Sequence, residues 1–294
     1  MSTTSVGGVP GYFTVTNVPA GGVAVTATNN SLVQTGGAFA TVTASTTSSV
    51  EVRMESRRSL PTDLEVGDGF YYGVGSTYAE VRSSAYYDDQ VSLLSPLGTG
   101  LRLRVDGDVP CCTSIMARDP LVENGRGFVV GPMRTGRGLF MTRKIFVAGG
   151  TNAPGQRFLR YLDVVRNPFE TDVEVTVTLA TYPSIFSWST LHEAPDYSWF
   201  AGIPTNASTV GLGVVNFDGL GVLPLNATFY EQRFRVVIPA GGSVGFLRFL
   251  ELGPRGTGAA DALRDRILDL RDLNNDALAG LSEAERRSIV NFLP

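Results

Sequence analysis

The feature that most constrains this chain is a repeated alternation between two kinds of side chain. Residues 23–28, 38–44, 50–54, 101–105 and 173–179 each alternate in polarity or size with a period of two. Successive side chains of a β-strand point to opposite faces of a sheet, whereas a helix repeats every 3.6 residues. The alternation therefore predicts half-buried antiparallel strands along much of the chain.

Glycine and proline stand where such strands need turns. The chain contains 34 Gly and 16 Pro among its 294 residues, more than a typical globular protein uses. Pro19–Gly22 and Gly36–Gly37 are turn signals, and Pro239–Gly242 is typical of a hairpin turn. Residues 234–238 and 244–250, on either side of that last turn, are nearly continuous apolar runs. They predict central strands that are covered on both faces.

These patterns divide the chain into four parts. Residues 1–55 hold about four strands, too few for a complete sandwich, and residues 56–68 are expected to form a linker. Residues 69–254 predict one large antiparallel β-sandwich, and residues 255–294 predict a helical segment. The predicted fold class is mainly β: an immunoglobulin-like or prealbumin-like partial sandwich, a larger antiparallel β-sandwich and a short two-helix C-terminus.

The two helices are predicted from different signals. Residues 259–273 carry an apolar stripe at helical spacing, formed by Ala260, Leu263, Ile267 and Leu270. Further on, Ser282-Glu-Ala-Glu285 is a capping box, from which a second helix is expected to run to about Phe292. Helices this short do not fold alone, so both are expected to pack on the sandwich.

The N-terminal strands resemble a known family. Gly11 to Gly22 is Gly-Tyr-Phe-Thr-Val-Thr-Asn-Val-Pro-Ala-Gly-Gly, and a Val-Ala-Val-Thr-Ala strand follows it. This sequence resembles the carboxypeptidase-regulatory-like, or prealbumin-like, sandwiches. The resemblance covers about 45 residues and lacks the family's first two strands, because ten residues precede Gly11. It implies a partial sandwich with an open sheet edge.

A second resemblance covers about residues 120–294. Its segments, in order, are residues 160–168, 173–179, 238–249 and 277–292. Together they resemble a module of very large secreted bacterial surface proteins, where it alternates with immunoglobulin-like and regulatory-like sandwiches. The resemblance implies an extracellular or cell-surface location. The chain itself has no signal peptide at Met1, which is expected of an excised segment or of a relative that assembles by itself.

The chain lacks the residues that most catalytic sites need. Lys144 is the only lysine and His192 the only histidine, and no Gly-rich phosphate loop precedes that lysine. Cys111 and Cys112 are adjacent, so they supply neither a disulfide framework nor a zinc site. A net charge of −4 gives no footprint for nucleic acid, and no apolar run is long enough for a membrane helix. We therefore expect a protein that is not an enzyme.

An aromatic region is the first candidate binding site. It contains Tyr182, Trp188, His192, Tyr197 and Trp199, and both tryptophans of the chain are among them. Exposed rings could stack on sugars or anchor a protein interface, and His192 beside a glutamate could titrate near neutral pH. The alternative is that the rings fill the sandwich core.

A weaker candidate is a calcium loop near the C-terminus. Asp272, Asn274, Asp276 and Glu283 occupy positions 1, 3, 5 and 12 of an EF-hand spacing, where oxygen ligands are needed. Position 6 is Ala277, although the sharp turn requires glycine. The alternative is a polar connection between two helices, without any cofactor.

These observations together predict a non-catalytic structural or adhesive β-sandwich module. Its partners would be other protein domains or copies of itself, and the open edge of the N-terminal sheet would invite strand addition and self-assembly. The alternative function is a carbohydrate-binding module that uses the aromatic region and binds glycans.

Overall fold

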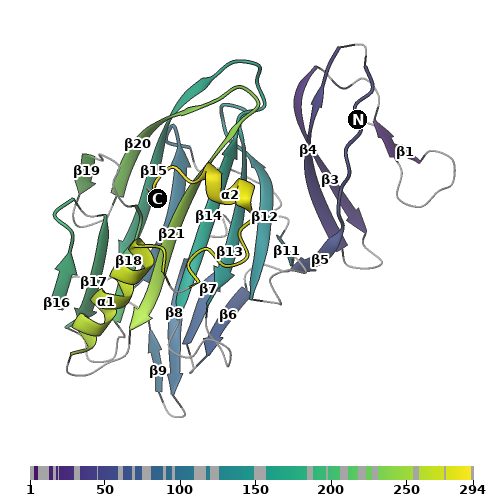
Figure 1. Cartoon of the computed structure of the whole chain (residues 1–294). Coiled ribbons are helices and arrows are strands. Elements are labelled where there is room, and N and C mark those ends of the chain that lie inside the picture. The colour runs from purple at the N-terminus through teal and green to yellow at the C-terminus, as the bar shows by residue number, and fades with distance from the viewer. Residues whose placement is uncertain are drawn as a thin grey trace.

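The computed structural model describes most of the chain (Figure 1). The described residues are 3–5, 13–15, 18, 20–29, 34–44, 46–58, 62–67, 70–74, 81–88, 91–94, 97–108, 117–119, 126–148, 157–183, 188–196, 198–205, 211–217, 223–226, 231–253, 258–274 and 276–292. Cys111, Cys112, the Tyr197 ring and the turn before Gly21 apart from its residues 18 and 20 lie outside them.

The fold is mainly β, with two large antiparallel sheets, as the alternation predicts. The larger sheet holds, in spatial order, β16 (Trp188–Glu193), β17 (Trp199–Pro204), β18 (Gly211–Val215), β21 (Ser243–Gly253), β14 (Phe158–Arg166), β13 (Phe140–Val147), β12 (Gly127–Arg134), β11 (Ala117–Asp119), β5 (Glu55–Arg58), β4 (Gln34–Val42) and β3 (Gly21–Asn29). The smaller holds β19 (Leu223–Asn226), β20 (Glu231–Ile238), β15 (Val173–Pro183), β10 (Leu97–Val105), β8 (Val81–Asp88), β7 (Phe70–Val74) and β6 (Thr62–Gly67), with β9 (Val91–Leu94) beside β8. Separately, β1 (Thr3–Ser5) pairs with β2 (Phe13–Val15).

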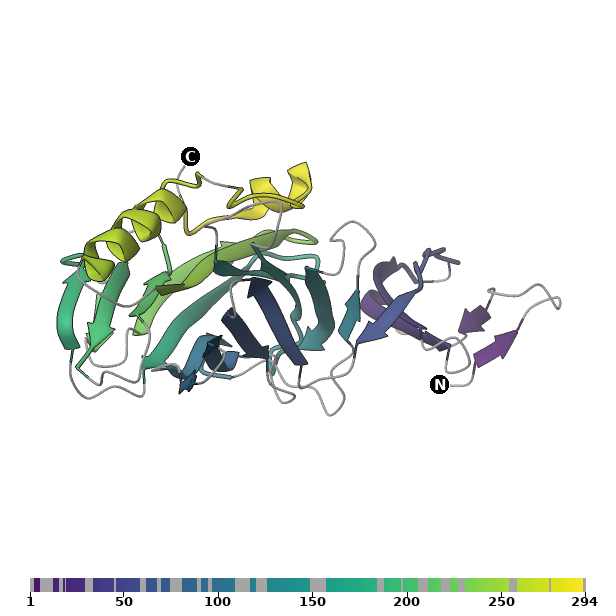
Figure 2. The same cartoon turned by 90° about the horizontal axis from the view of Figure 1, so that it is seen from below.

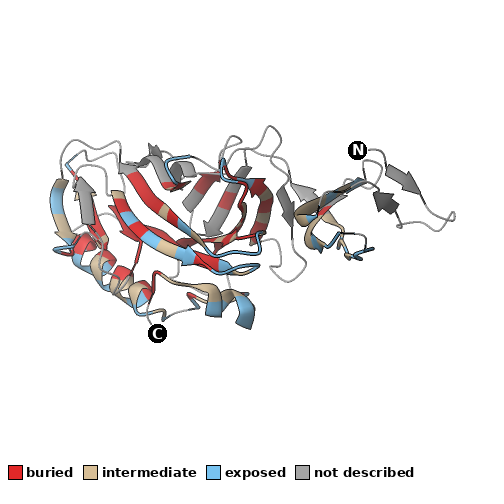
Figure 3. Ribbon diagram, turned by 90° about the horizontal axis from the view of Figure 1, so that it is seen from above, coloured by how far each residue is buried: buried red, intermediate tan, exposed pale blue. Residues whose placement is uncertain are grey.

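The two sheets pack face to face in a sandwich-like arrangement. Their inner faces share one apolar core, which includes Val177 from the smaller sheet and Ile145 and Phe246 from the larger. Tyr72 joins the layers at one end: its hydroxyl donates to the carbonyl of Arg157 at 2.5 Å and accepts the amide of Leu252 at 3.1 Å. Figure 3 shows buried residues concentrated in these central strands.

The two predicted helices are present and cover the outer face of the larger sheet. α1 (Ala259–Arg271) buries the predicted stripe of Ala260, Leu263, Ile267 and Leu270 over β17, β18 and β21. α2 (Glu283–Ser288) begins at Ser282 with the predicted capping box. It is shorter than expected, because the chain leaves the helix at Ile289 and Val290 donates its amide to the carbonyl of Gly245 in β21.

The N-terminal strands leave the sandwich as an arm (Figure 2). We use "arm" for β3 and β4, two strands of nine residues each. They are not a separate sheet, because β4 pairs with β5 and β5 pairs through β11 with β12 of the sandwich. The segment that was expected to be a linker, residues 56–68, therefore carries most of β5 and the strand β6.

Two local expectations for the arm are wrong. Gly36–Gly37 lies inside β4, where Ala27 faces Gly36, so it is not the turn. Residues 50–54 form no strand. Both differences have one cause: the chain at Arg53 passes so close to β4 that a Cβ on Gly36 would stand 2.3 Å from the Arg53 carbonyl oxygen. The glycine therefore serves close packing.

The second turn prediction is right locally and wrong in topology. Residues 239–242 form a turn in which Gly242 donates to the Pro239 carbonyl at 2.9 Å and Gly241 has a φ of 65°. The strands on either side belong to different sheets, so the turn connects the layers and is not a hairpin. Of the two, β21 is buried throughout, as predicted, whereas β20 lies beside the edge strand β19 and has exposed residues at alternate positions.

Candidate protein interface

The strand β3 ends the larger sheet, and its strand partner among the described residues is β4. The register runs from Gly21 to Asn29 without a bulge. No charged residue lies in either strand, and the first charged residue of the chain is Glu51. A long, regular, uncharged edge strand is a template for pairing with another chain.

The other edge strands carry the features that natural proteins use against such pairing. β9 and β19 have four residues each, and β19 contains Pro224. β6 contains Asp63 and Glu65, and β16 contains Glu193 and a register irregularity. Short length, charge, proline and bulges all oppose strand addition. Among these edges, β3 combines the greatest length with none of these protections.

The arm is fixed to the end of the sandwich rather than loosely attached. The ring of Phe39 lies 5.3 Å from the ring of Phe140, and the Arg166 guanidinium lies 5.2 Å from the Phe39 centroid. Gly22 packs directly on Pro168, where any side chain would collide at 2.0 Å. These contacts hold β3 in one orientation, which lowers the ordering cost of adding a partner strand.

The two tryptophans of the aromatic region do not form one platform. Trp188 on β16 faces the inner core and lies 5.9 Å from the Phe200 ring, edge to face. Trp199 on β17 belongs to the outer cluster beneath α1. Neighbouring residues of a strand point to opposite faces, so Trp199 and Phe200 are separated by the sheet itself. Both tryptophans are half-buried; Tyr182 lies in β15, and its side chain is outside the described part, as Tyr197 is.

His192 faces the helix α1 rather than a nucleophile. Its Nε2 lies 3.2 Å from an Asp261 carboxylate oxygen in the first turn of α1. Glu193, the next residue along β16, points by strand alternation to the other face. The contact joins the outermost strand of the sheet to the helix above it, and it resembles a structural anchor more than a catalytic pair.

The structure does not bring the calcium-loop residues together. The Asp272 carboxylate pairs with Arg271 at 2.8 Å, and the Glu283 carboxylate pairs with Arg287 at 3.0 Å. Asp276 has a positive φ of 61° and lies in the turn between the helices. Within the described residues, no group of three or more His, Cys, Asp or Glu side chains is placed to hold a metal ion. The polar helix connection is the better description of this segment.

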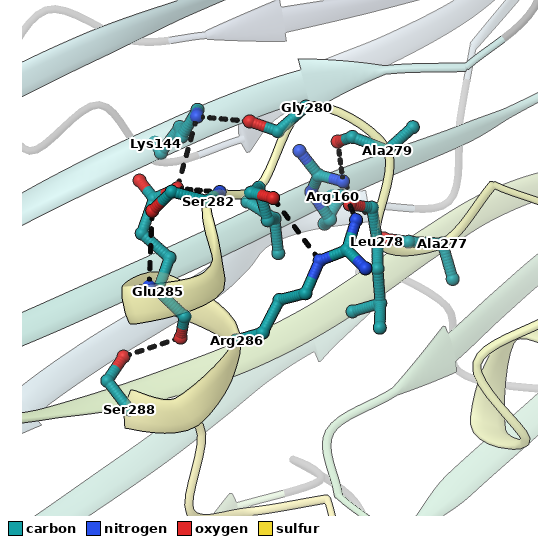
Figure 4. A network of polar contacts seen from close by, with 11 residues as sticks. Lys144, Arg160, Ala277, Leu278, Ala279, Gly280, Ser282, Glu285, Arg286 and Ser288 are labelled. Carbon is teal, nitrogen blue, oxygen red and sulfur yellow. Dashed lines mark hydrogen bonds and ion pairs between the residues drawn. The ribbon is translucent and has the colours of Figure 1, made fainter.

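Lys144, the single lysine, binds that helix connection from below (Figure 4). Its Nζ donates to the Gly280 carbonyl at 2.6 Å and lies 3.5 Å from the Glu285 carboxylate. Arg160 donates to the carbonyls of Ala277 and Ala279 at 2.9 and 2.6 Å.

Arg286 completes this arrangement by donating to the carbonyls of Leu278 and Leu281, both at 3.2 Å. Five consecutive carbonyls, residues 277–281, therefore accept hydrogen bonds from cationic side chains. Charge-assisted bonds of this kind are stronger than neutral ones, and they fix the C-terminal segment on the sheet. Lys144 lies in the middle of β13, not at a strand start.

A buried ionic triad lies between the two sheets. The Asp163 carboxylate accepts hydrogen bonds from Arg143, at 2.6 Å to Nε, and from Arg248, and all three side chains are almost fully buried. Arg248 also donates to the Arg102 carbonyl of the other sheet at 2.9 Å. Sequence patterns missed this triad, although charged residues inside the apolar runs of β14 and β21 were the available signal.

Glu251 is a second buried carboxylate, under α1. Burial raises its pKa to about 7, although its ion pair with Arg266 acts in the opposite direction. Burial, and then the charge of Glu251, also raise the pKa of Tyr72. These groups are enclosed in packed layers, so the arrangement supports stability rather than chemistry on a substrate.

Comparisons with known proteins assign no family. No family model matches the chain, and no curated protein matches it. Among solved structures, a putative kojibiose phosphorylase from human microbiome is similar over 87% of this chain at 7% identity, with a TM-score of 0.35. This chain spans 34% of that protein's length. A likeness this distant assigns neither a fold family nor an activity. Among the described residues, no helix is long and apolar enough to cross a membrane.

Proposed function

We propose that this chain is a non-catalytic structural module of an extracellular or cell-surface assembly that works through protein–protein contacts. In this proposal the sandwich is a rigid body and the arm presents the contact. The immunoglobulin-like and prealbumin-like character expected for the two parts belongs to the same proposal. The carrying observation is the β3 edge: nine residues in regular register, without charge, at the end of an eleven-stranded sheet.

The contact follows from the backbone chemistry of an edge strand. An edge strand presents N–H and C=O groups in the plane of the sheet, and a strand from another protein can pair with them. Small side chains along β3, such as Ala24 and Thr26, place no steric barrier beside the backbone. Main-chain bonds supply the affinity in such contacts, and the flanking side chains supply the selectivity.

The test is whether β3 accepts an added strand. The probe is a labelled, alternating Val/Thr peptide of the same length as β3, titrated against the full chain by fluorescence anisotropy. Thr26→Lys places a charge on β3, and Thr190→Lys places the same charge on the edge strand β16, where Thr190 is also exposed. We expect binding that Thr26→Lys weakens about tenfold or more and Thr190→Lys leaves unchanged. Equal binding by both variants, or no binding, overturns the proposal.

A further inference from the structure

We infer that the partner of the β3 edge is a second copy of this chain, paired antiparallel through β3 of each copy about a twofold axis. The inference rests on the proposed function and names its partner. It would extend the larger sheet continuously from one sandwich, through two arms, into the other.

Charge selects the second copy over other partners. In a twofold strand pair, each side chain faces a residue of the same strand, so any charged residue would lie near a like charge. β6, with Asp63 and Glu65, would repel its own copy. β3 has no charge, and no charged residue occurs before Glu51, so β3 neither repels itself nor attracts a charged partner.

Geometry also permits this pairing. The arm projects from the end of the sandwich, so two arms can meet while the sandwiches stand apart (Figures 1 and 2). Phe39 and Gly22 fix the arm against Phe140 and Pro168, which sets one orientation for both copies. A twofold contact of one edge with itself is closed, so the assembly stops at a dimer and does not grow into a filament.

The size of the contact sets its strength. Nine residues at about 3.4 Å each give a paired length of about 30 Å, and one strand pair buries less than a standard interface. The dimer is therefore expected to depend on concentration, with dissociation at high dilution. This expectation distinguishes it from an obligate dimer with a large apolar interface.

The test combines sedimentation with a cysteine scan of the full chain. Sedimentation velocity over a concentration series compares the wild type with Thr26→Lys and with the matched Thr190→Lys. We expect a monomer–dimer equilibrium that Thr26→Lys weakens about tenfold or more, whereas Thr190→Lys keeps it. Circular dichroism and urea unfolding check that both variants are folded.

The scan places single cysteines at Val23, Ala24, Val25 and Thr26 in a chain that carries Cys111→Ser and Cys112→Ser. Mild oxidation should crosslink copies at alternate positions, because neighbouring side chains of a strand lie on opposite faces. Uniform crosslinking, open-ended oligomers, or a monomer up to about 1 mM overturn the inference. A monomer that still binds the Val/Thr peptide at β3 overturns the second copy as partner and leaves the proposed function standing.

Discussion

The arm and the sandwich solve the problem of stability in opposite ways. The sandwich buries charge together with apolar surface: the Arg143–Asp163–Arg248 triad lies inside it and Glu251 lies beneath its helix. The arm has no charge, and its side chains are mostly half-buried or exposed (Figure 3). The sandwich is therefore complete by itself, whereas the arm has surface and backbone left to bury. A module that must hold its shape and also meet a partner is expected to separate these tasks in this way.

The largest expected effect comes from breaking the ionic triad of the sandwich. Asp163→Asn removes the charge that two buried guanidiniums share, and an uncompensated buried charge costs about 4 kcal/mol of unfolding free energy. Urea unfolding measures this loss. Asp265→Asn, at an exposed position of α1, is the control and should change the free energy by less than about 0.5 kcal/mol. A loss below about 1 kcal/mol for Asp163→Asn would mean that the triad does not matter to the sandwich.

The next effect is a pH dependence that belongs to the sandwich alone. The pKa of Glu251 is raised from 4.5 to about 7 in the folded chain, so the folded state holds this proton more tightly than the unfolded state. Its contribution is complete below pH 4.5 and is lost as the pH rises to about 7, a change of about 3 kcal/mol at most. Glu251→Gln should remove this part of the decline.

The measurement is the difference in unfolding free energy between wild type and Glu251→Gln at several pH values. The difference cancels the other titrating carboxylates. If the two curves stay parallel from pH 4.5 to 7, Glu251 does not titrate in this window and burial does not raise its pKa.

The smallest expected effect on global stability comes from the arm. Phe39→Ala removes the ring that contacts Phe140 and Arg166, and such a half-buried contact is worth about 1 kcal/mol. Amide hydrogen exchange should accelerate in β3 and β4 and stay unchanged in β14 and β21. Thr41→Ala, at an exposed position of β4, is the matched control. Acceleration throughout the sandwich would show that arm and sandwich unfold as one unit, and the contrast between them would fall.

Sequence reasoning succeeded where the signal is local and failed where it depends on distant packing. The stripe from Ala260 to Leu270 and the capping box at Ser282 involve neighbours within a turn of helix, and both were predicted correctly. The turn after Pro239 was predicted, but its two strands entered different sheets, because turn chemistry does not determine which layer each strand joins. Gly36 has the composition of a turn and the position of a close contact with Arg53.

The candidate sites show the same limit. The open β3 edge was expected from an incomplete N-terminal sheet, and the structure places β3 at the end of the larger sheet. The proximity of Trp188 and Trp199 in sequence suggested a shared surface, but they face opposite sides of the sheet. Arg160 and Asp163 lie in one apolar strand and serve different faces, a distinction that appears only when their partners are in place.

The carbonyls of residues 277–281 also set an order of events during synthesis. Lys144 and Arg160 emerge from the ribosome more than a hundred residues before the backbone oxygens that accept their hydrogen bonds. Until residues 277–281 are made, these cations lie on a sheet face that the chain cannot yet cover, and water must solvate them. The sandwich therefore closes its outer face last, and a nascent chain released before this turn would expose both cations together with the apolar surface around them.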